Sequence, residues 1–338
     1  MTISRKALSL AVAAAGVSVA IVFMAPFSRP VQGQVSSAIT ESDLLNWVTA
    51  FSNHGRWENV GLGAANLITP HKRLQASRLV HRGISVSMAH NVPQTAAEDP
   101  TFLARLILNP PGSTFISDRY QYQGTYHGST HSHLDALGCH VHFQGRGWNN
   151  LSSEVTQDAG CSAEQGGIIA FKDGVFTRGI LIDIARFKGV PWLEAGEAAT
   201  YDDLIDYEKW ANIKIRSGDA VFLRTGRWTR QAQVGPYTGG LPGWHASVIQ
   251  FFHERDVSYI GNDAINDVVP TGFPNSAFVL PVHQIVMPTM GINIFDNLDL
   301  EELSALAADL KRYEFLLTAS PLRIDKGLGS PANPIATF

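Results

Sequence analysis

The chain has 338 residues, of which 45% are hydrophobic and 17% are charged. This balance is that of a folded globular protein, and it excludes an intrinsically disordered chain. The formal net charge is −4 and no basic stripe is visible, so we exclude nucleic acid as a partner.

The N-terminal residues have the pattern of a targeting segment. Arg5 and Lys6 precede an uncharged, mostly apolar run over residues 7–27. We predict that residues 1–33 are either a cleaved signal peptide or an uncleaved membrane anchor. Either segment exports the protein to the periplasm or the medium and leaves one domain over residues 34–338.

The rest of the chain alternates between helix and strand patterns. Thr40 and Thr200 are predicted N-caps, because acidic residues fill the first helical turn after each of them. Further elements follow from apolar periodicity, with strands expected in 82–90, 176–185, 215–226 and 257–264 and helices in 41–51, 245–256 and 300–310. The alternation predicts an α/β or mixed α+β fold, and neither an internal repeat nor a linker divides it.

A cluster of histidines is the clearest functional signal. Five of the twelve histidines fall within sixteen residues, namely His127, His131, His133, His140 and His142. In a strand, the side chains of His131, His133 and Asp135 would point to one face. Two imidazoles and a carboxylate suit Zn, Mn or Fe, and such sites leave a position for a water molecule whose pKa the metal lowers.

The two cysteines leave several roles open. Cys139 and Cys161 could form a disulfide, which an exported protein permits. Cys139 lies inside the histidine cluster, so it is also a candidate ligand. We favour a buried or paired cysteine over a ligand.

The cluster resembles a family motif. The stretch "HGSTHSHLDALGCH", which contains His127 and Asp135, is similar to the H-x-G-T-H-x-D-x-x-x-H motif of the cyclase family of metal-dependent hydrolases. That family includes bacterial kynurenine formamidase and isatin hydrolase. The resemblance extends over residues 115–310, through segments such as "SGDAVFLRTGRW", "YIGNDA" and "VHQIVMPTMGINIFDNLDLEEL".

The resemblance implies a fold and an activity. The fold is the swivelling β/β/α type, an α/β arrangement with a β-barrel-like core, assembled as a homodimer or homotetramer. The activity is hydrolysis of an amide or ester/lactone bond in a small cyclic or aromatic substrate, with Zn or Mn as cofactor. His283 and Asp296 stand where the family places a downstream histidine and acid at the metal.

Two positions depart from the motif. Ser129 replaces its first histidine, so either His127 or His131 takes over its role or the site holds one ligand fewer. Cys139 replaces its last histidine, and His140 follows one position later. We assign proton transfer to His140, on the condition that a local bulge re-aims its side chain.

Four further residues each have a functional and a structural interpretation. Trp148 would line an aromatic pocket or pack in the core, and Arg224 would bind a substrate carboxylate or form an ion pair. Asp263 would orient a ligand histidine or form a turn. His142, two residues after His140, would contact the ligand side chains without binding the metal itself.

Two other functions remain open at this point. His133, Asp135 and a remote histidine could form the two-His-one-carboxylate iron site of an oxidoreductase. An exported protein that binds a metal or ligand without turnover would need the same residues.

Overall fold

The computed structural model describes residues 39–93, 114, 125–154, 160–274 and 276–338, and the backbone of 104–108 and 118–122. The predicted signal peptide or anchor over 1–33 lies outside these residues. No helix in the described ranges is long and apolar enough to cross a membrane.

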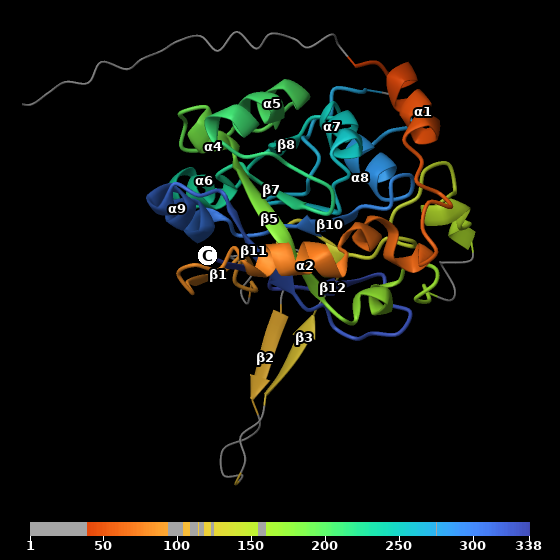
Figure 1. Ribbon diagram of the computed structural model, residues 1–338, viewed down its shortest axis with the longest axis horizontal. Coiled ribbons are helices and arrows are strands. Elements are labelled where there is room, and N and C mark those ends of the chain that lie inside the picture. The colour runs from red at the N-terminus through yellow and green to blue at the C-terminus, as the bar shows by residue number, and fades with distance from the viewer. Residues whose placement is uncertain are drawn as a thin grey trace, which may run out of the picture. The chain divides into compact units, whose positions relative to one another are not determined.

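The core of the fold is a nine-stranded sheet that curls into a half-barrel (Figure 1). Its strand order is β1-β13-β11-β5-β7-β9-β10-β4-β12. In that order the strands are Ser85–Ser87, Ile335–Thr337, Glu314–Ala319, Val175–Asp183, Ala220–Arg224, Tyr259–Asn262, Asn293–Asp296, His133–Asp135 and Gly329–Pro331. β5, β7, β9 and β10 run parallel, and antiparallel strands complete both sides.

Two small sheets lie outside the main one. β2 (Ala104–Leu108) pairs with β3 (Asp118–Tyr122) in antiparallel fashion, and β6 (Ala198–Ala199) pairs with β8 (Gly243–Trp244) in parallel. β6 and β8 connect the segments that precede α5 and α7.

Helices cover the sheet, and Figure 1 shows α4, α5, α7 and α8 on one side of it. The α-helices are α1 (Glu41–Ala50), α2 (Pro70–Ser77), α4 (Ile184–Phe187), α5 (Tyr201–Trp210), α6 (Arg227–Val234), α7 (Val248–Glu254), α8 (Pro281–Val286) and α9 (Glu301–Leu310). The 3-10 helices are η1 (Val60–Leu67), η2 (Trp148–Asn150) and η3 (Ile168–Phe171). The predicted α/β class with a barrel-like core is confirmed.

Local sequence explains where two of these helices begin. The hydroxyl of Thr40 accepts a hydrogen bond from the backbone N–H of Asp43, whose carboxylate accepts one from the backbone N–H of Thr40. Thr200 and Asp203 form the same capping box at the start of α5. Both predicted N-caps are therefore confirmed, and each satisfies N–H groups that the first helical turn leaves without partners.

The parallel strands have two chemically different ends. Their middles are apolar and buried on both faces, as in Ala220–Arg224, which is expected for strands covered on both sides. Polar and charged side chains gather where these strands begin and where they end.

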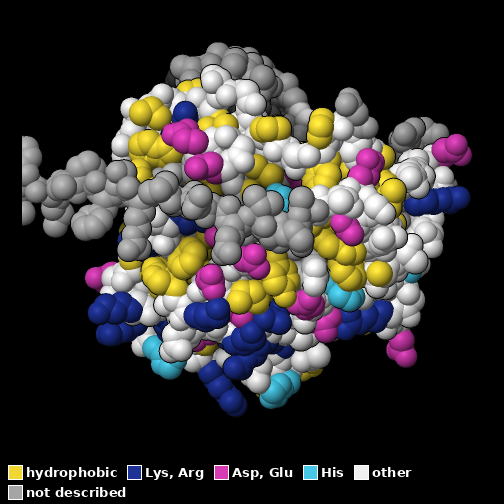
Figure 2. Space-filling model, turned by 90° about the horizontal axis from the view of Figure 1, so that it is seen from above, with side chains coloured by type: hydrophobic (Ala, Val, Ile, Leu, Met, Phe, Trp, Pro, Cys, Tyr) yellow, Lys and Arg dark blue, Asp and Glu magenta, His cyan; other side chains and the backbone are white. Residues whose placement is uncertain are grey.

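On the surface, Figure 2 shows acidic and basic side chains interspersed on one face, with lysines and arginines gathered toward its lower part in that view.

Candidate functional site

β4 and β10 bring three ligand-type side chains together. His133 and Asp135 are two residues apart in β4 and share one face of the strand. The antiparallel register sets His133 directly opposite Asp296 of β10. Nε2 of His133 therefore lies 3.3 Å from Oδ1 of Asp135 and 3.9 Å from Oδ2 of Asp296. Asn293 secures this pairing, since its Nδ2 donates to the carbonyl oxygen of Asp135 at 3.0 Å.

α8 adds a fourth side chain, His283. Its Nε2 lies 3.3 Å from Oδ2 of Asp296, and its Nδ1 lies 2.6 Å from Oδ2 of Asp267. The carboxylate of Asp267 also accepts the backbone N–H groups of Val282 and His283 at the start of α8. Asp267 therefore fixes the orientation of the imidazole and directs its Nε2 toward Asp296.

The segments before and after β4 supply two more imidazoles. Nδ1 of His127 lies 2.7 Å from Oδ1 of Asp135, and Nε2 of His140 lies 3.6 Å from the same oxygen. The two rings stack with their centroids 4.0 Å apart. Asp135 is thus the common neighbour of three histidines.

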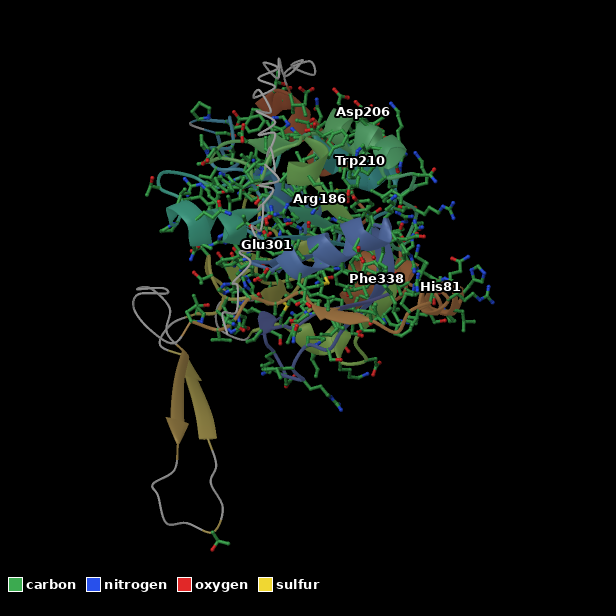
Figure 3. All side chains as sticks on the ribbon, turned by 90° about the vertical axis from the view of Figure 1, so that its left-hand side faces the viewer. His81, Arg186, Asp206, Trp210, Glu301 and Phe338 are labelled. Atoms are coloured by element: carbon green, nitrogen blue, oxygen red, sulfur yellow. A yellow bond between two sulfur atoms is a disulfide. The ribbon has the colours of Figure 1, made fainter. Side chains whose placement is uncertain are left out.

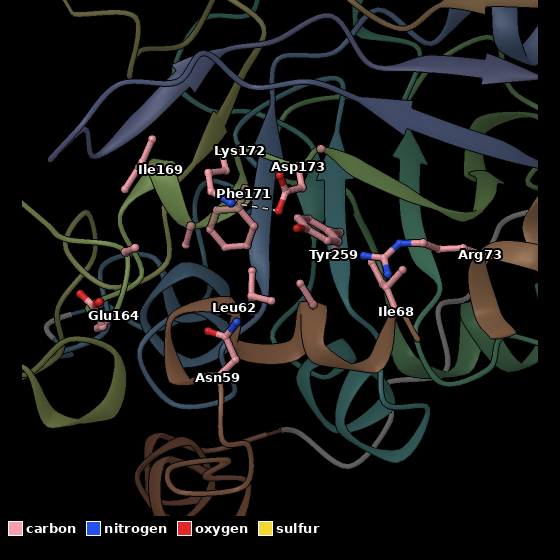
Figure 4. Close-up of a pocket in the computed structure, with 14 residues that line it drawn as sticks. Asn59, Leu62, Ile68, Arg73, Glu164, Ile169, Phe171, Lys172, Asp173 and Tyr259 are labelled. Carbon is pink, nitrogen blue, oxygen red and sulfur yellow. Dashed lines mark hydrogen bonds and ion pairs between the residues drawn. The ribbon is translucent and has the colours of Figure 1, made fainter. Parts of the chain in front are cut away.

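These side chains face a cavity of about 450 Å³. Its described lining is His127, Gly128, His133, His140, Val141, His142, Ile265, Val279, Leu280, His283, Gln284 and Asp296. A second cavity, of about 330 Å³, lies where the parallel strands begin and includes Tyr259 and Phe171 (Figure 4). The first cavity is the candidate site because His127, His133, His140 and Asp296 line it together, whereas no histidine is among the described residues that line the second.

The electrostatics of the cluster follow from its burial. Burial favours the neutral ring of His133, but Asp135 and Asp296 outweigh it and raise the pKa to about 9. Burial also favours the neutral ring of His283, but the carboxylates of Asp296 and Asp267 outweigh it and hold the pKa of His283 well above its ordinary value. Burial would raise the pKa of Asp135, yet the surrounding imidazoles hold it well below its usual range. Protons on imidazoles therefore balance the buried negative charge.

Burial dominates at His140, and the neighbouring histidines disfavour its charged form as well. The pKa of His140 is lowered to about 4, although Asp135 opposes the change. The ring is thus neutral at pH 7 in the metal-free protein. A neutral imidazole is the form that binds a metal ion or accepts a proton.

The cluster offers the donor atoms of a metal site. Two groups of three residues have ligand atoms within 4.8 Å of one another, and they are His127, Asp135, His140 and His133, Asp135, Asp296. Their shared member, Asp135, has a buried Oδ2 atom without a hydrogen-bond partner among the described residues. A buried carboxylate oxygen without a donor is costly unless a cation binds it. The residues present therefore fit a divalent cation, since imidazole and carboxylate together suit such ions.

Comparisons with known proteins identify the family. A family model described as "Putative cyclase" matches residues 70–266. The chain belongs to the cyclase family. No protein with a curated description matches it significantly.

Solved structures of the cyclase fold agree with this assignment. A crystal structure described as a novel cyclase is 28% identical, with a TM-score of 0.73 over 85% of this chain and 99% of that one. An isatin hydrolase bound to the product analogue thioisatinate is 16% identical, with a TM-score of 0.54 over 79% of this chain and 98% of its own. Isatin hydrolase A from Ralstonia solanacearum is 18% identical, with a TM-score of 0.53 over 79% and 97%. The two isatin hydrolases share the fold.

The structure brings together most of the predicted ligands of this cyclase-family site, but not His131. Nδ1 of His131 contacts the carbonyl oxygen of Ser132, and the ring lines another cavity beside His90. Within the described residues, neither group of ligand atoms includes it. The expected three-residue strand face is wrong at this position because β4 begins only at His133.

Two predicted substrate-binding residues lie elsewhere. The indole Nε1 of Trp148 donates to the carbonyl oxygen of Val60 at 2.7 Å, and the residue is only 2% exposed, so Trp148 packs in the core. Arg224 forms ion pairs with Asp183 at 2.9 Å and with Glu301 at 2.6 Å. Glu301 lies at the start of α9 (Figure 3). Neither Trp148 nor Arg224 is among the residues that line the cavity.

Asp263 forms a turn, and it does not orient a histidine. Its carboxylate accepts the backbone N–H groups of Thr225, Gly226 and Arg227. His142 does line the cavity, next to Val141. The acid that orients a ligand histidine is instead Asp267, which sequence reasoning missed although it follows Asp263 by four residues. Asn266 was also missed, and its Nδ2 donates to Oδ1 of Asp296 at 2.6 Å.

Proposed function

We propose that this protein is a metal-dependent hydrolase that cleaves an amide or ester bond, lactones included, in a small cyclic or aromatic substrate. The observation that carries the proposal is the buried Asp135, whose Oδ2 has no donor among the described residues and whose neighbours are imidazoles. Family membership supports the reaction class. We also extend to this chain the hydrolytic activity of the isatin hydrolases that share its fold.

The proposed cofactor is Zn or Mn. His133, Asp135 and Asp296 would hold the ion, with His283 beside Asp296 and with His127 as a further donor. A divalent cation at such a site polarises a carbonyl oxygen and makes hydroxide available near neutral pH. Asp267 keeps the ring of His283 in one orientation, which is the usual role of a carboxylate behind a ligand histidine.

His140 is the proposed proton carrier. Its side chain is 26% exposed and lines the cavity, so its ring can reach both substrate and solvent. Nε2 of His140 can accept a proton beside Asp135 and pass it to the leaving group. His142 and His127 would form the adjoining wall.

The cavity is suited to a flat, largely apolar substrate. Its apolar wall is formed by Val141, Ile265, Val279 and Leu280. These side chains offer apolar contact to a substrate, and about 450 Å³ is within the range of small-molecule sites. The histidines and carboxylates opposite would act on the bond to be cleaved.

The proposal extends to location and assembly. A disulfide between Cys139 and Cys161, together with the basic and apolar residues of 1–33, supports an exported protein. We include the homo-oligomer implied by the family in the same proposal. Cell fractionation and light scattering of the purified protein would test the two points separately.

Elemental analysis tests the proposal directly. The protein from residue 34 onward is purified without chelators, beside an Asp135→Asn variant, and both are assayed on a panel of amides, esters and lactones. We expect near-stoichiometric Zn or Mn and hydrolysis in the wild type, and neither in the variant. Stoichiometric iron with oxygen consumption would replace the proposal by an oxidoreductase, and tight metal binding without turnover would replace it by a binding protein.

A further inference from the structure

The disulfide Cys139–Cys161 lies directly beside the proposed site. Its two Cα atoms are 5.9 Å apart and 22 residues separate the two cysteines in sequence. Both are buried, at 4% and 0% exposure. Cys139 is the residue before His140, so the bond fixes the backbone that carries this imidazole.

The segment that Cys139 is tied to is itself firmly held. The backbone N–H of Cys161 donates to the carbonyl oxygen of Lys326 at 3.2 Å, and that of Gly167 donates to the carbonyl oxygen of Ser162 at 2.8 Å. Gly138 donates to the carbonyl oxygen of Gly166 at 3.2 Å. A Cβ atom at Gly138 would collide with the carbonyl oxygen of Gln165, so the two segments touch along their backbones.

The ring of His140, in contrast, is largely buried but held by few polar contacts within the described residues. Among the described residues, the ring forms no hydrogen bond shorter than its 3.6 Å ion pair with Asp135, and it stacks on His127. Its position is therefore set by its backbone. His133, Asp135 and Asp296 are held differently, by the register of β4 and β10, which does not involve the disulfide.

We infer that Cys139 and Cys161 are positioning residues, whose disulfide holds His140 against Asp135 for proton transfer. The inference rests on the proposed hydrolase function. It explains how a cysteine serves at the position where the family motif carries a histidine: the bond fixes the backbone that carries His140, the next residue. It also makes turnover depend on the oxidised state of the protein.

Reduction would loosen the backbone of His140 but not the residues that β4 and β10 hold in place. A water-soluble trialkylphosphine reduces the bond with one water molecule: the S–S bond gains two electrons and two protons, and the phosphine becomes its oxide. Because both sulfurs are buried, reduction should be slow in the folded protein. After reduction His140 loses its fixed backbone, while the sheet-held His133, Asp135 and Asp296 remain in place.

The test compares Cys139→Ser, Cys161→Ser and the double variant with oxidised and phosphine-reduced wild type. We expect kcat to fall about 10- to 100-fold in all four altered forms, the range seen when support of a site residue is lost, with KM nearly unchanged. Bound metal should stay close to the wild-type stoichiometry, and alkylation followed by mass spectrometry would confirm the thiol state. Circular dichroism would show whether each variant is folded, and the reduced wild type supplies the result if a variant is not.

Each outcome decides a separate point. Unchanged kcat in fully reduced, folded protein would overturn the inference but leave the hydrolase proposal intact. A loss of kcat in Cys139→Ser but not in Cys161→Ser would also overturn it, because the thiol of Cys139 would then act as a ligand. Absence of both metal and hydrolysis in oxidised wild type would instead refute the proposed function.

Discussion

Two buried charge clusters lie at opposite ends of the parallel strands, and they are neutralised in different ways. Where the strands begin, Asp219 forms ion pairs with Lys72 and Arg178. Where the strands end, Asp135 and Asp296 have imidazoles as their neighbours.

The difference separates a structural cluster from a functional one. Arg178 keeps its proton at every physiological pH, and its ion pair compensates the carboxylate of Asp219 even though burial lowers the pKa of Lys72. An imidazole gives up its proton near neutral pH, so a divalent cation can replace protons around Asp135. The identity of the compensating cation thus indicates which buried carboxylate is free to bind a ligand.

Removing each carboxylate from the metal-free protein tests whether the Asp219 and Asp135 clusters are neutralised in different ways. We expect Asp219→Asn to lower the free energy of unfolding by about 3–5 kcal/mol, because Arg178 remains charged and largely buried without this partner. Asp135→Asn should cost distinctly less, because the neighbouring histidines can lose their protons. Urea denaturation measures both.

The matched control for this pair is Asp206→Asn. Asp206 forms an exposed ion pair with Lys209, in which the side chains are 72% and 61% exposed for lysine and aspartate. Such pairs contribute about 0–1 kcal/mol. Equal losses in Asp219→Asn and Asp135→Asn would show that the two clusters are not chemically distinct.

Metal addition should stabilise only proteins whose functional cluster is intact. At a free Zn or Mn concentration of about 100 times the Kd, wild type should gain about 2.7 kcal/mol in unfolding free energy. Asp219→Asn should show the same gain from its lower baseline, and Asp135→Asn should show none. Thermal melts with and without metal test this, and a gain in Asp135→Asn would place the ion elsewhere.

A smaller effect, on metal affinity, is expected at Asp267, which contacts the proposed ligand His283. Asp267→Asn removes the carboxylate that accepts from His283, which should weaken metal binding about 10- to 100-fold. Asp263→Asn is the matched control, because that carboxylate binds a backbone turn. Isothermal titration on both variants measures the difference. Equal affinities would mean that α8 alone orients His283.

The smallest expected effect is the pH dependence of stability that Glu208 contributes. Like Asp219, this carboxylate has a lysine and an arginine as partners. Burial would raise the pKa of Glu208, but hydrogen bonds from Lys214 and Arg255 outweigh it, and the pKa is lowered below 4.5. A lowered pKa stabilises the fold above pH 4.5, and this contribution is lost as the pH falls through the native value. Wild type should therefore exceed Glu208→Gln in stability at pH 7, and the two should converge in acid. Parallel urea curves at several pH values would check it.

Much of the fold was predictable because its signals are local. The capping boxes at Thr40 and Thr200 involve residues three apart, and the buried strands are apolar along their lengths. The predicted strand in 82–90 shrank to Ser85–Ser87, because its pairing with β13 spans three residues. The strand order could not be predicted, since it depends on pairings between distant segments.

The site was predictable in composition and less so in geometry. The density of histidines and the spacing of His133 and Asp135 predicted most of the side chains that the structure brings together at the cavity. His131 was misplaced because the length of β4 is set by pairing with β10 and β12. An ion pair was one of the two roles predicted for Arg224, but its partner could not be named because Glu301 lies 77 residues away in sequence.

The contact of Asn293 with the backbone of Asp135 joins residues 158 apart in sequence, which has a consequence for how the protein matures. During synthesis the histidine-rich segment emerges long before β10, so any ion it captures early meets only part of the coordination sphere. The remaining donors arrive when β10 closes against β4, late in folding, because long-range strand pairing is slow. Metal binding would thus follow folding. The ion would bind a site that is already formed and would not direct its formation.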